Sequence, residues 1–127
     1  MATMIPASMS LDIKSNAEKH IFECFKNDPD TEGWIVLHSL GIATHQRVIH
    51  GETDFLVLAP GLGMFALEVK GGRIKRKLGK WHFINKYGNL DEKVRGPFDQ
   101  AWEGIYSIRK SVESKLDTSH KHLKNMI

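Results

Sequence analysis

The feature that most limits how this chain can fold is a pair of apolar segments joined by a very short connection. Residues 54–59 and 64–70 are rich in strand-forming side chains, and they flank the sequence Pro60-Gly61-Leu62-Gly63. We predict two antiparallel strands of one hairpin, because so short a connection reverses the chain and returns it alongside itself. The exact length of the loop then fixes which residues face each other.

The loop length also decides whether two carboxylates meet. With the three-residue loop Pro60-Gly61-Leu62, Asp54 lies directly opposite Glu68 and on the same face of the sheet. A four-residue loop would shift the pairing by one residue and send Asp54 to the other face. In the three-residue register we expect the carboxylate oxygens about 3–6 Å apart, close enough to share one divalent ion. Side chains on opposite faces would exclude such a site.

A lysine completes this group of charged residues. Glu68 and Lys70 project from the same side of their strand, since strand side chains alternate between faces. Alone, the two are most simply explained as an exposed strand end with a local ion pair. Asp54 changes that interpretation, because paired carboxylates with open positions are ligands that Mg²⁺ or Mn²⁺ prefers. Lys70 could then hold a water nucleophile or neutralise a phosphate, and the Val69 carbonyl is a further candidate ligand.

The remaining pattern predicts an α/β (α+β) domain with a mixed sheet between helices. Residues 1–9 carry no periodic pattern, and 88–96 form a polar loop. Helical periodicity covers about residues 11–26 and again from Pro97 to about Leu116, and further strands are expected at 34–38, 73–77 and 81–85. In the second helix we expect an apolar face made of Phe98, Ala101, Trp102, Ile105, Val112 and Leu116. Gln100 then lies on the other side, together with Gly104, Ser107 and Ser111.

Composition limits the class of protein. A chain of 127 residues has room for one domain, with its core at about 11–116, and 41% hydrophobic with 26% charged residues is typical of a folded protein. The sequence contains no apolar run of the roughly 18 residues that a membrane span requires. Cys24 is the one cysteine, and it predicts a buried thiol without a histidine partner. Together these features indicate a reducing, cytoplasmic setting without membrane partners.

Basic residues gather just after the proposed site. The net charge is only +3, but Arg73, Lys75, Arg76, Lys77 and Lys80 follow Lys70 with no acidic residue among them. Such a cluster attracts phosphates, and we expect Arg73, Lys75, Arg76 and Lys80 to hold a DNA backbone without reading its sequence. A solvated, charged hairpin is the simpler alternative.

The spacing of Asp54 and Glu68-Val69-Lys70 resembles the split Asp…Glu-x-Lys signature of the restriction-endonuclease-like PD-(D/E)xK superfamily. More closely, the chain resembles the nuclease-related domain (NERD) family of that superfamily, from about Ala17 to Ile108. Glu-x-Lys alone is a weak signal, but six segments match in order. They are residues 17–19, 33–40, 51–58, 67–72, 79–81 and 97–101.

The resemblance implies a restriction-endonuclease-like fold and metal-dependent phosphodiester hydrolysis. It assigns metal binding to Asp54 and Glu68 and catalysis to Lys70. It also brings Glu18 of the first helix and Gln100 of the later helix to the site. In the family this domain is often fused to others, including superfamily 1 DNA helicases, and we expect this chain to be a fragment of such a protein. Because one site cuts one strand, clean double-strand breaks would require a homodimer or two binding events.

Several alternatives stay open. Glu18 lies three residues after Ser15 and could simply cap a helix, and Gln100 could belong to a solvated stripe. His38, His45, His50 and His82 lack the spacing of zinc ligands and are expected at the surface or behind the site. For the whole chain the alternatives are a non-catalytic DNA-binding module, an RNase, or a structural domain that leaves the converging charges unexplained.

Overall fold

The structure is a computed structural model that describes residues 1–13, 15–41 and 52–119. Its centre is a four-stranded sheet in the order β1-β2-β3-β4. The strands are β1 (Thr3–Ile5), β2 (Ile35–Gly41), β3 (Glu52–Ala59) and β4 (Gly63–Leu67). β1 runs parallel to β2, whereas β2, β3 and β4 pair antiparallel. The sheet is therefore mixed, as predicted.

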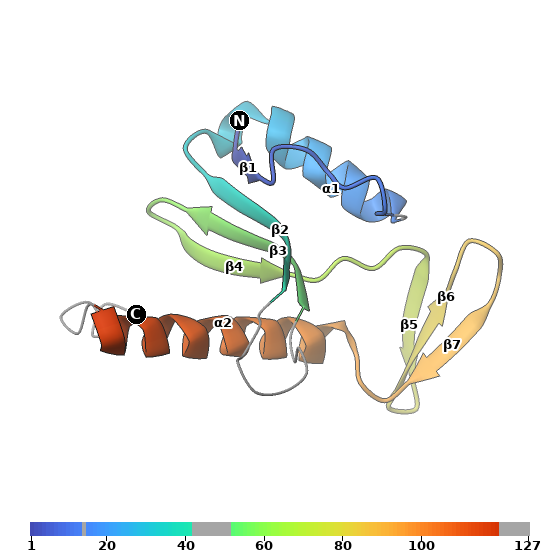
Figure 1. Cartoon of the computed structure of the whole chain (residues 1–127). Helices are drawn as coiled ribbons and strands as arrows, with labels where there is room; N and C mark the ends of the chain where they lie inside the picture. Colours follow the sequence, from blue (N-terminus) through green and yellow to red (C-terminus); the bar gives the residue numbers. More distant parts are fainter. Residues whose placement is uncertain (14, 42–51, 120–127) are drawn as a thin grey trace.

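Two helices lie on opposite faces of this sheet (Figure 1). α1 (Asn16–Asn27) is followed by the single 3₁₀ turn η1 (Pro29–Thr31), and α2 (Pro97–Ser119) is the long helix after the strands. A second sheet of β5 (Arg73–Lys77), β6 (Lys80–Ile84) and β7 (Leu90–Lys93) projects to one side. We call it the projecting sheet. The predicted α+β class with helices flanking a mixed sheet is confirmed.

Strand alternation divides the core into two layers. On the α1 side, Phe22 of the helix packs against Val36, Phe55 and Val57, all nearly inaccessible to solvent. On the α2 side, Leu56 packs against Ile108. Because neighbouring residues of β3 point to opposite faces, one strand anchors both helices. β3 and the connection beyond its partner β4 carry the proposed site, so these residues rest on the best-buried part of the fold.

Some boundaries differ from the prediction. α1 begins at Asn16 rather than near Leu11, because the Ser15 hydroxyl accepts the Glu18 backbone N–H at 3.2 Å and caps the helix there. β1 and β7 are strands within segments that we predicted to be irregular. Both are short, and each is held by pairing with a longer neighbour rather than by a pattern of its own.

The predicted apolar face of α2 is wrong in part: Ile105 packs beside Leu56 and Ile108 and Ala101 is partly buried, but the aromatic members of the face are exposed. Phe98 and Trp102 are 76% and 70% exposed, whereas Gly104 is buried and Ile108 is only 5% exposed. α2 packs on β3 and β4 through the side that carries Gly104, which was expected to face away. The packed side of α2 therefore combines Gly104 with Ile105 and Ile108 rather than with Phe98 and Trp102.

The prediction for Cys24 is also wrong. Its thiol is exposed, and Sγ lies 3.8 Å from His20 Nε2, one helical turn earlier.

Within the described residues, no helix is long and apolar enough to span a bilayer.

Candidate active site

The register of the β3–β4 hairpin is the one that brings the carboxylates together. Phe55 pairs with Leu67 and Ala59 with Gly63, so the loop is Pro60-Gly61-Leu62. Continuing this register by one residue places Asp54 opposite Glu68, just beyond the end of β4. The predicted three-residue register is confirmed.

Asp54 is fastened to the segment that carries Glu68 and Lys70. The backbone N–H of Val69 donates a hydrogen bond to Asp54 Oδ2 at 2.7 Å. Burial raises the pKa of Asp54 above its ordinary value, and the charges of Glu68 and Glu18 raise it further, against the lowering effects of the Val69 hydrogen bond and of Lys70. Three carboxylates therefore share one electrostatic environment.

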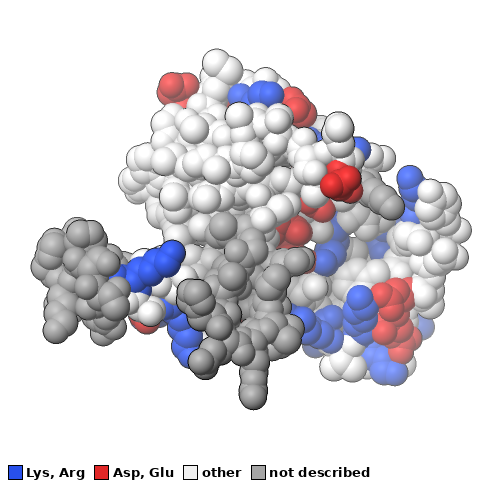
Figure 2. All heavy atoms as spheres, viewed as in Figure 1, with Lys and Arg blue, Asp and Glu red and all other residues white. Residues whose placement is uncertain are grey.

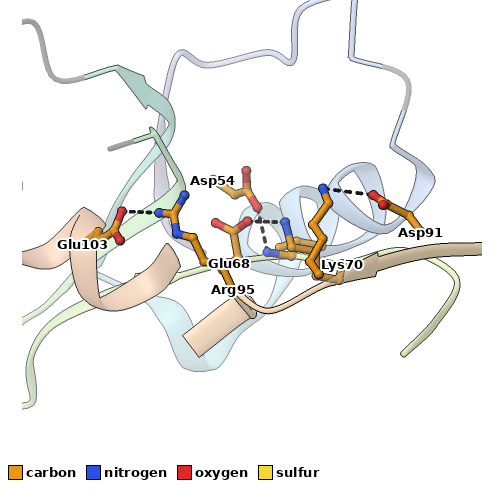
Figure 3. Close-up of polar contacts among 8 residues, drawn as sticks. Asp54, Glu68, Lys70, Asp91, Arg95 and Glu103 are labelled. Carbon is orange, nitrogen blue, oxygen red and sulfur yellow. Dashed lines mark hydrogen bonds and ion pairs between the residues drawn. The ribbon is translucent and has the colours of Figure 1, made fainter. Parts of the chain in front are cut away.

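Glu68 and Lys70 form an ion pair between Glu68 Oε1 and Lys70 Nζ. Their side chains are 10% and 27% exposed, so the pair is largely withdrawn from solvent. Figure 3 shows Asp54, Glu68 and Lys70 converging between the two helices. The simpler interpretation of Glu-x-Lys, an exposed ion pair at a strand end, does not fit this burial.

A second pair lies behind Asp54, and sequence reasoning missed it. Glu18 Oε2 lies 3.0 Å from His38 Nε2, and the His38 side chain is only 2% exposed. The His38 ring packs against Phe22 and Phe55. Thus the backbone of Glu18 takes part in the helix cap while its carboxylate reaches the interior. The sequence offered one signal for this, a histidine on the inward-facing side of a strand.

The backbone of β2 is unusual opposite Asp54. His38 pairs with Phe55 and Leu40 with Thr53, so Ser39 is the residue that faces Asp54. Ser39 has a φ of 55°. This is the left-handed backbone conformation, which residues other than glycine seldom adopt. Strain of this kind persists only where the surrounding structure imposes it, and it gathers at functional sites.

The donor atoms at this site fit a divalent cation. Asp54 and Glu68 supply carboxylate oxygens, and the intervening Val69 has a carbonyl, all of which are hard oxygen ligands. A cation would also relieve the cost of keeping Asp54 ionised while buried, which its raised pKa records. Within the described residues, no group of three or more His, Cys, Asp or Glu side chains has metal-binding geometry. A cation here would therefore rest on two carboxylates, with water and phosphate completing its shell.

Gln100 and His82, two other residues considered in the sequence analysis, make no hydrogen bond or ion pair with the three central residues in the described part of the chain. Gln100 lies in the first turn of α2 and is partly buried, and within the described part of the chain its side chain makes no hydrogen bond to Asp54, Glu68 or Lys70. His82 faces Glu92 at 3.7 Å in the projecting sheet. His45 and His50 lie outside the described residues.

The predicted phosphate-binding residues lie on the projecting sheet, but not on one face. Arg73 and Lys75 share a face, whereas Arg76 points to the other face and lies over the Trp81 ring. Lys80 is paired with Glu92 at 2.8 Å. Figure 2 shows basic side chains concentrated over this sheet beside one acidic patch. Arg73 and Lys75 are thus the candidates that lie together.

Comparison with known proteins decides the family. The model of the nuclease-related domain matches residues 13–126, nearly the whole chain. The chain belongs to the nuclease-related domain family. No curated protein and no solved structure matches it. Membership of the nuclease-related domain family indicates a nuclease-related function and interaction with nucleic acid. It agrees with the carboxylates and lysine gathered at the hairpin end.

Proposed function

We propose that this nuclease-related domain is a Mg²⁺- or Mn²⁺-dependent deoxyribonuclease that hydrolyses phosphodiester bonds at Asp54, Glu68 and Lys70. The observation that carries the proposal is the hairpin register, which sets Asp54 opposite Glu68. Two partly buried carboxylates and a lysine are costly to keep together unless they serve a ligand. A partly buried carboxylate whose pKa is raised, as that of Asp54 is, is typical of functional sites.

Each residue has a distinct task in this proposal. Asp54, Glu68 and the Val69 carbonyl would hold the cation, which supplies charge stabilisation for the phosphate and a more acidic water. Lys70 Nζ, kept at the site by Glu68, places a positive charge where negative charge develops on the phosphate. Glu18, held by His38, adds negative charge beside Asp54 and so favours a cation there. Gln100 is proposed to line the edge of the site.

The first prediction concerns metal dependence. Incubated with Mg²⁺ or Mn²⁺, the purified domain should cut DNA, and with EDTA it should not. The panel includes single-stranded, duplex and circular DNA as well as RNA, analysed on denaturing gels. Cutting of the circle would identify an endonuclease, and cutting of RNA alone would make the enzyme an RNase. DNA binding without cleavage under every metal condition would instead favour the non-catalytic binding module.

The second prediction concerns the projecting sheet. Because Arg73 and Lys75 share one face, the double variant Arg73→Glu, Lys75→Glu should bind DNA more weakly. The slope of log Kd against log salt should fall by about 1 for each phosphate that the variant no longer neutralises. Fluorescence anisotropy across a salt titration measures both.

The control for this prediction is Lys26→Glu, because Lys26 is an exposed cation on α1. It is compared with the single variant Lys75→Glu, which makes the same change of charge on the projecting sheet. Lys26→Glu should leave the salt slope unchanged. An equal loss in Lys26→Glu and Lys75→Glu would show that only the net charge of the domain matters, and that substrate does not follow this face.

The proposal also includes expectations about fused domains, oligomeric state and location in the cell. Fusion to a superfamily 1 helicase, a homodimer for double-strand cutting and a cytoplasmic location all stay predictions.

A further inference from the structure

Four aromatic rings form a line along the surface of the domain, and the nuclease site does not use them. Phe98, Trp102 and Tyr106 of α2 are 76%, 70% and 49% exposed. Residues four apart on a helix lie on one stripe, so these rings follow each other along α2. Trp81 of β6 extends the line, because its ring centroid lies 5.8 Å from that of Phe98. We call these four residues the aromatic track.

Packing within the fold holds Trp81 of the track in place. Trp81 packs against the backbone of Gly96, just before α2, where a Cβ would overlap the indole. The track also ends in a cation on each side. Arg76 lies over the Trp81 ring at 5.7 Å, and Lys110 lies over the Tyr106 ring at 4.8 Å. Within the described residues, neither cation has a carboxylate within ion-pair distance.

The acidic residues of α2 up to Lys115, the part of the helix whose side chains are described, are already paired. Asp99 accepts the Gly96 N–H at 2.9 Å, Glu103 pairs with Arg95, and Glu113 pairs with Arg109 at 2.9 Å. The exposed surface of the track therefore combines flat rings with unpaired cations. That combination is complementary to unpaired bases on a phosphate backbone.

We propose that the aromatic track binds single-stranded DNA, with bases stacked on Trp81, Phe98, Trp102 and Tyr106 and phosphates held by Arg76 and Lys110. The choice of nucleic acid rests on the proposed function, but the binding itself requires no cleavage. The spacing favours a single strand over a duplex. Successive rings on α2 are about 6 Å apart along the helix, wider than the ~3.4 Å rise of a duplex strand. A duplex also presents base edges, whereas rings require base faces.

The position of the track suits delivery of a strand to the site. α2 packs on β3 and β4, the two strands whose ends carry Asp54 and Glu68. Arg95 lies in the segment just before α2, and Figure 3 draws it with its partner Glu103 in the same close-up as Asp54 and Glu68. A strand lying along α2 therefore runs toward the nuclease site.

The test measures binding in EDTA, so that cleavage has no part in it. Fluorescein-labelled oligo-dT is titrated with the native chain, and tryptophan quenching is followed in parallel. Trp102→Ala and Phe98→Ala should each weaken binding by about 5- to 100-fold, the effect of losing one base–ring stack. Trp102→Phe, which keeps a ring, should recover most of the affinity. A blunt duplex of equal length should be bound less tightly by the native chain and should be little affected by either alanine variant.

Tyr87→Ala is the matched control, because Tyr87 is 75% exposed, carries its own cation contact with Lys86, and lies outside the track. It should bind oligo-dT as the native chain does. Unchanged oligo-dT affinity in a folded Phe98→Ala, Trp102→Ala double variant would overturn the proposal. So would sedimentation showing that the native chain self-associates through the track and the double variant does not. If the native chain binds as expected but never cleaves, the nuclease proposal fails and the track stands.

Discussion

Replacing Glu68 with glutamine is expected to abolish metal-dependent cleavage while leaving the fold intact. The substitution keeps the side-chain volume but removes one of two negative charges from the proposed cation site, so metal affinity should fall sharply. DNA affinity without metal should hold or rise, because one repulsion with phosphate disappears. Isothermal titration with Mn²⁺ and an anisotropy assay in EDTA measure the two effects separately.

Lys70→Met forms a pair with that variant. Metal should still bind, yet turnover should fall by about 10²-fold or more, the scale of losing one transition-state charge stabiliser. Each variant also breaks the Glu68–Lys70 ion pair, so thermal melts must show that both fold. Glu32→Gln and Lys26→Met, the same two replacements at exposed positions, should cut DNA normally. If folded Glu68→Gln and Lys70→Met also cut at the native rate, the catalytic centre lies elsewhere.

Asp54→Asn should lose cleavage to a similar extent and yet make the metal-free domain more stable. The pKa of Asp54 is raised in the folded chain, chiefly by burial. The folded state therefore holds this proton more tightly than the unfolded state. The free energy of unfolding then falls as pH rises from about the ordinary pKa of 3.8 through the raised value. Asparagine avoids this loss because it does not ionise, while its carbonyl can still accept the Val69 N–H.

Thermal melts in EDTA at several pH values test whether the charge on Asp54 lowers the free energy of unfolding. At neutral pH, Asp54→Asn should melt above the native chain, and below pH 3.8 the difference should vanish. Adding Mn²⁺ should raise the native melting temperature but not that of the variant, since a ligand stabilises only the state that binds it. A variant that melts lower than the native chain at neutral pH would contradict a destabilising charge at Asp54.

The strands of the two hairpins and the register of β3 with β4 could be predicted from the sequence, because local rules set them. Pro60-Gly61-Leu62 fixes the β3–β4 pairing, and that pairing alone brings Asp54 opposite Glu68. Likewise the strands expected at 73–77 and 81–85 are present and form the hairpin of β5 and β6. Where a turn and two patterned segments suffice, the sequence pattern predicts the geometry.

The parts that could not be predicted depend on distant contacts. Nothing local tells that Gly104 rather than Trp102 faces the sheet, because that choice depends on how closely α2 can approach β3 and β4. The Glu18–His38 pair joins residues 20 positions apart, on a helix and a strand whose relative placement the sequence does not give. β1 is held by its pairing with β2 and by the burial of Met4 in the core, both of which are distant contacts.

The projecting sheet is joined to the rest of the domain by two short segments, and the first of them passes through the proposed site. The segment before β5 contains Glu68 and Lys70 and then Gly71-Gly72, and Gly72 has a φ of 80° at a place where a side chain would overlap the Ile84 carbonyl. The second, after β7, contains Arg95. Both lead directly into elements fixed on the core. A ligand that binds the outer end of the projecting sheet therefore acts on a part of the chain that is covalently continuous with Glu68 and Lys70.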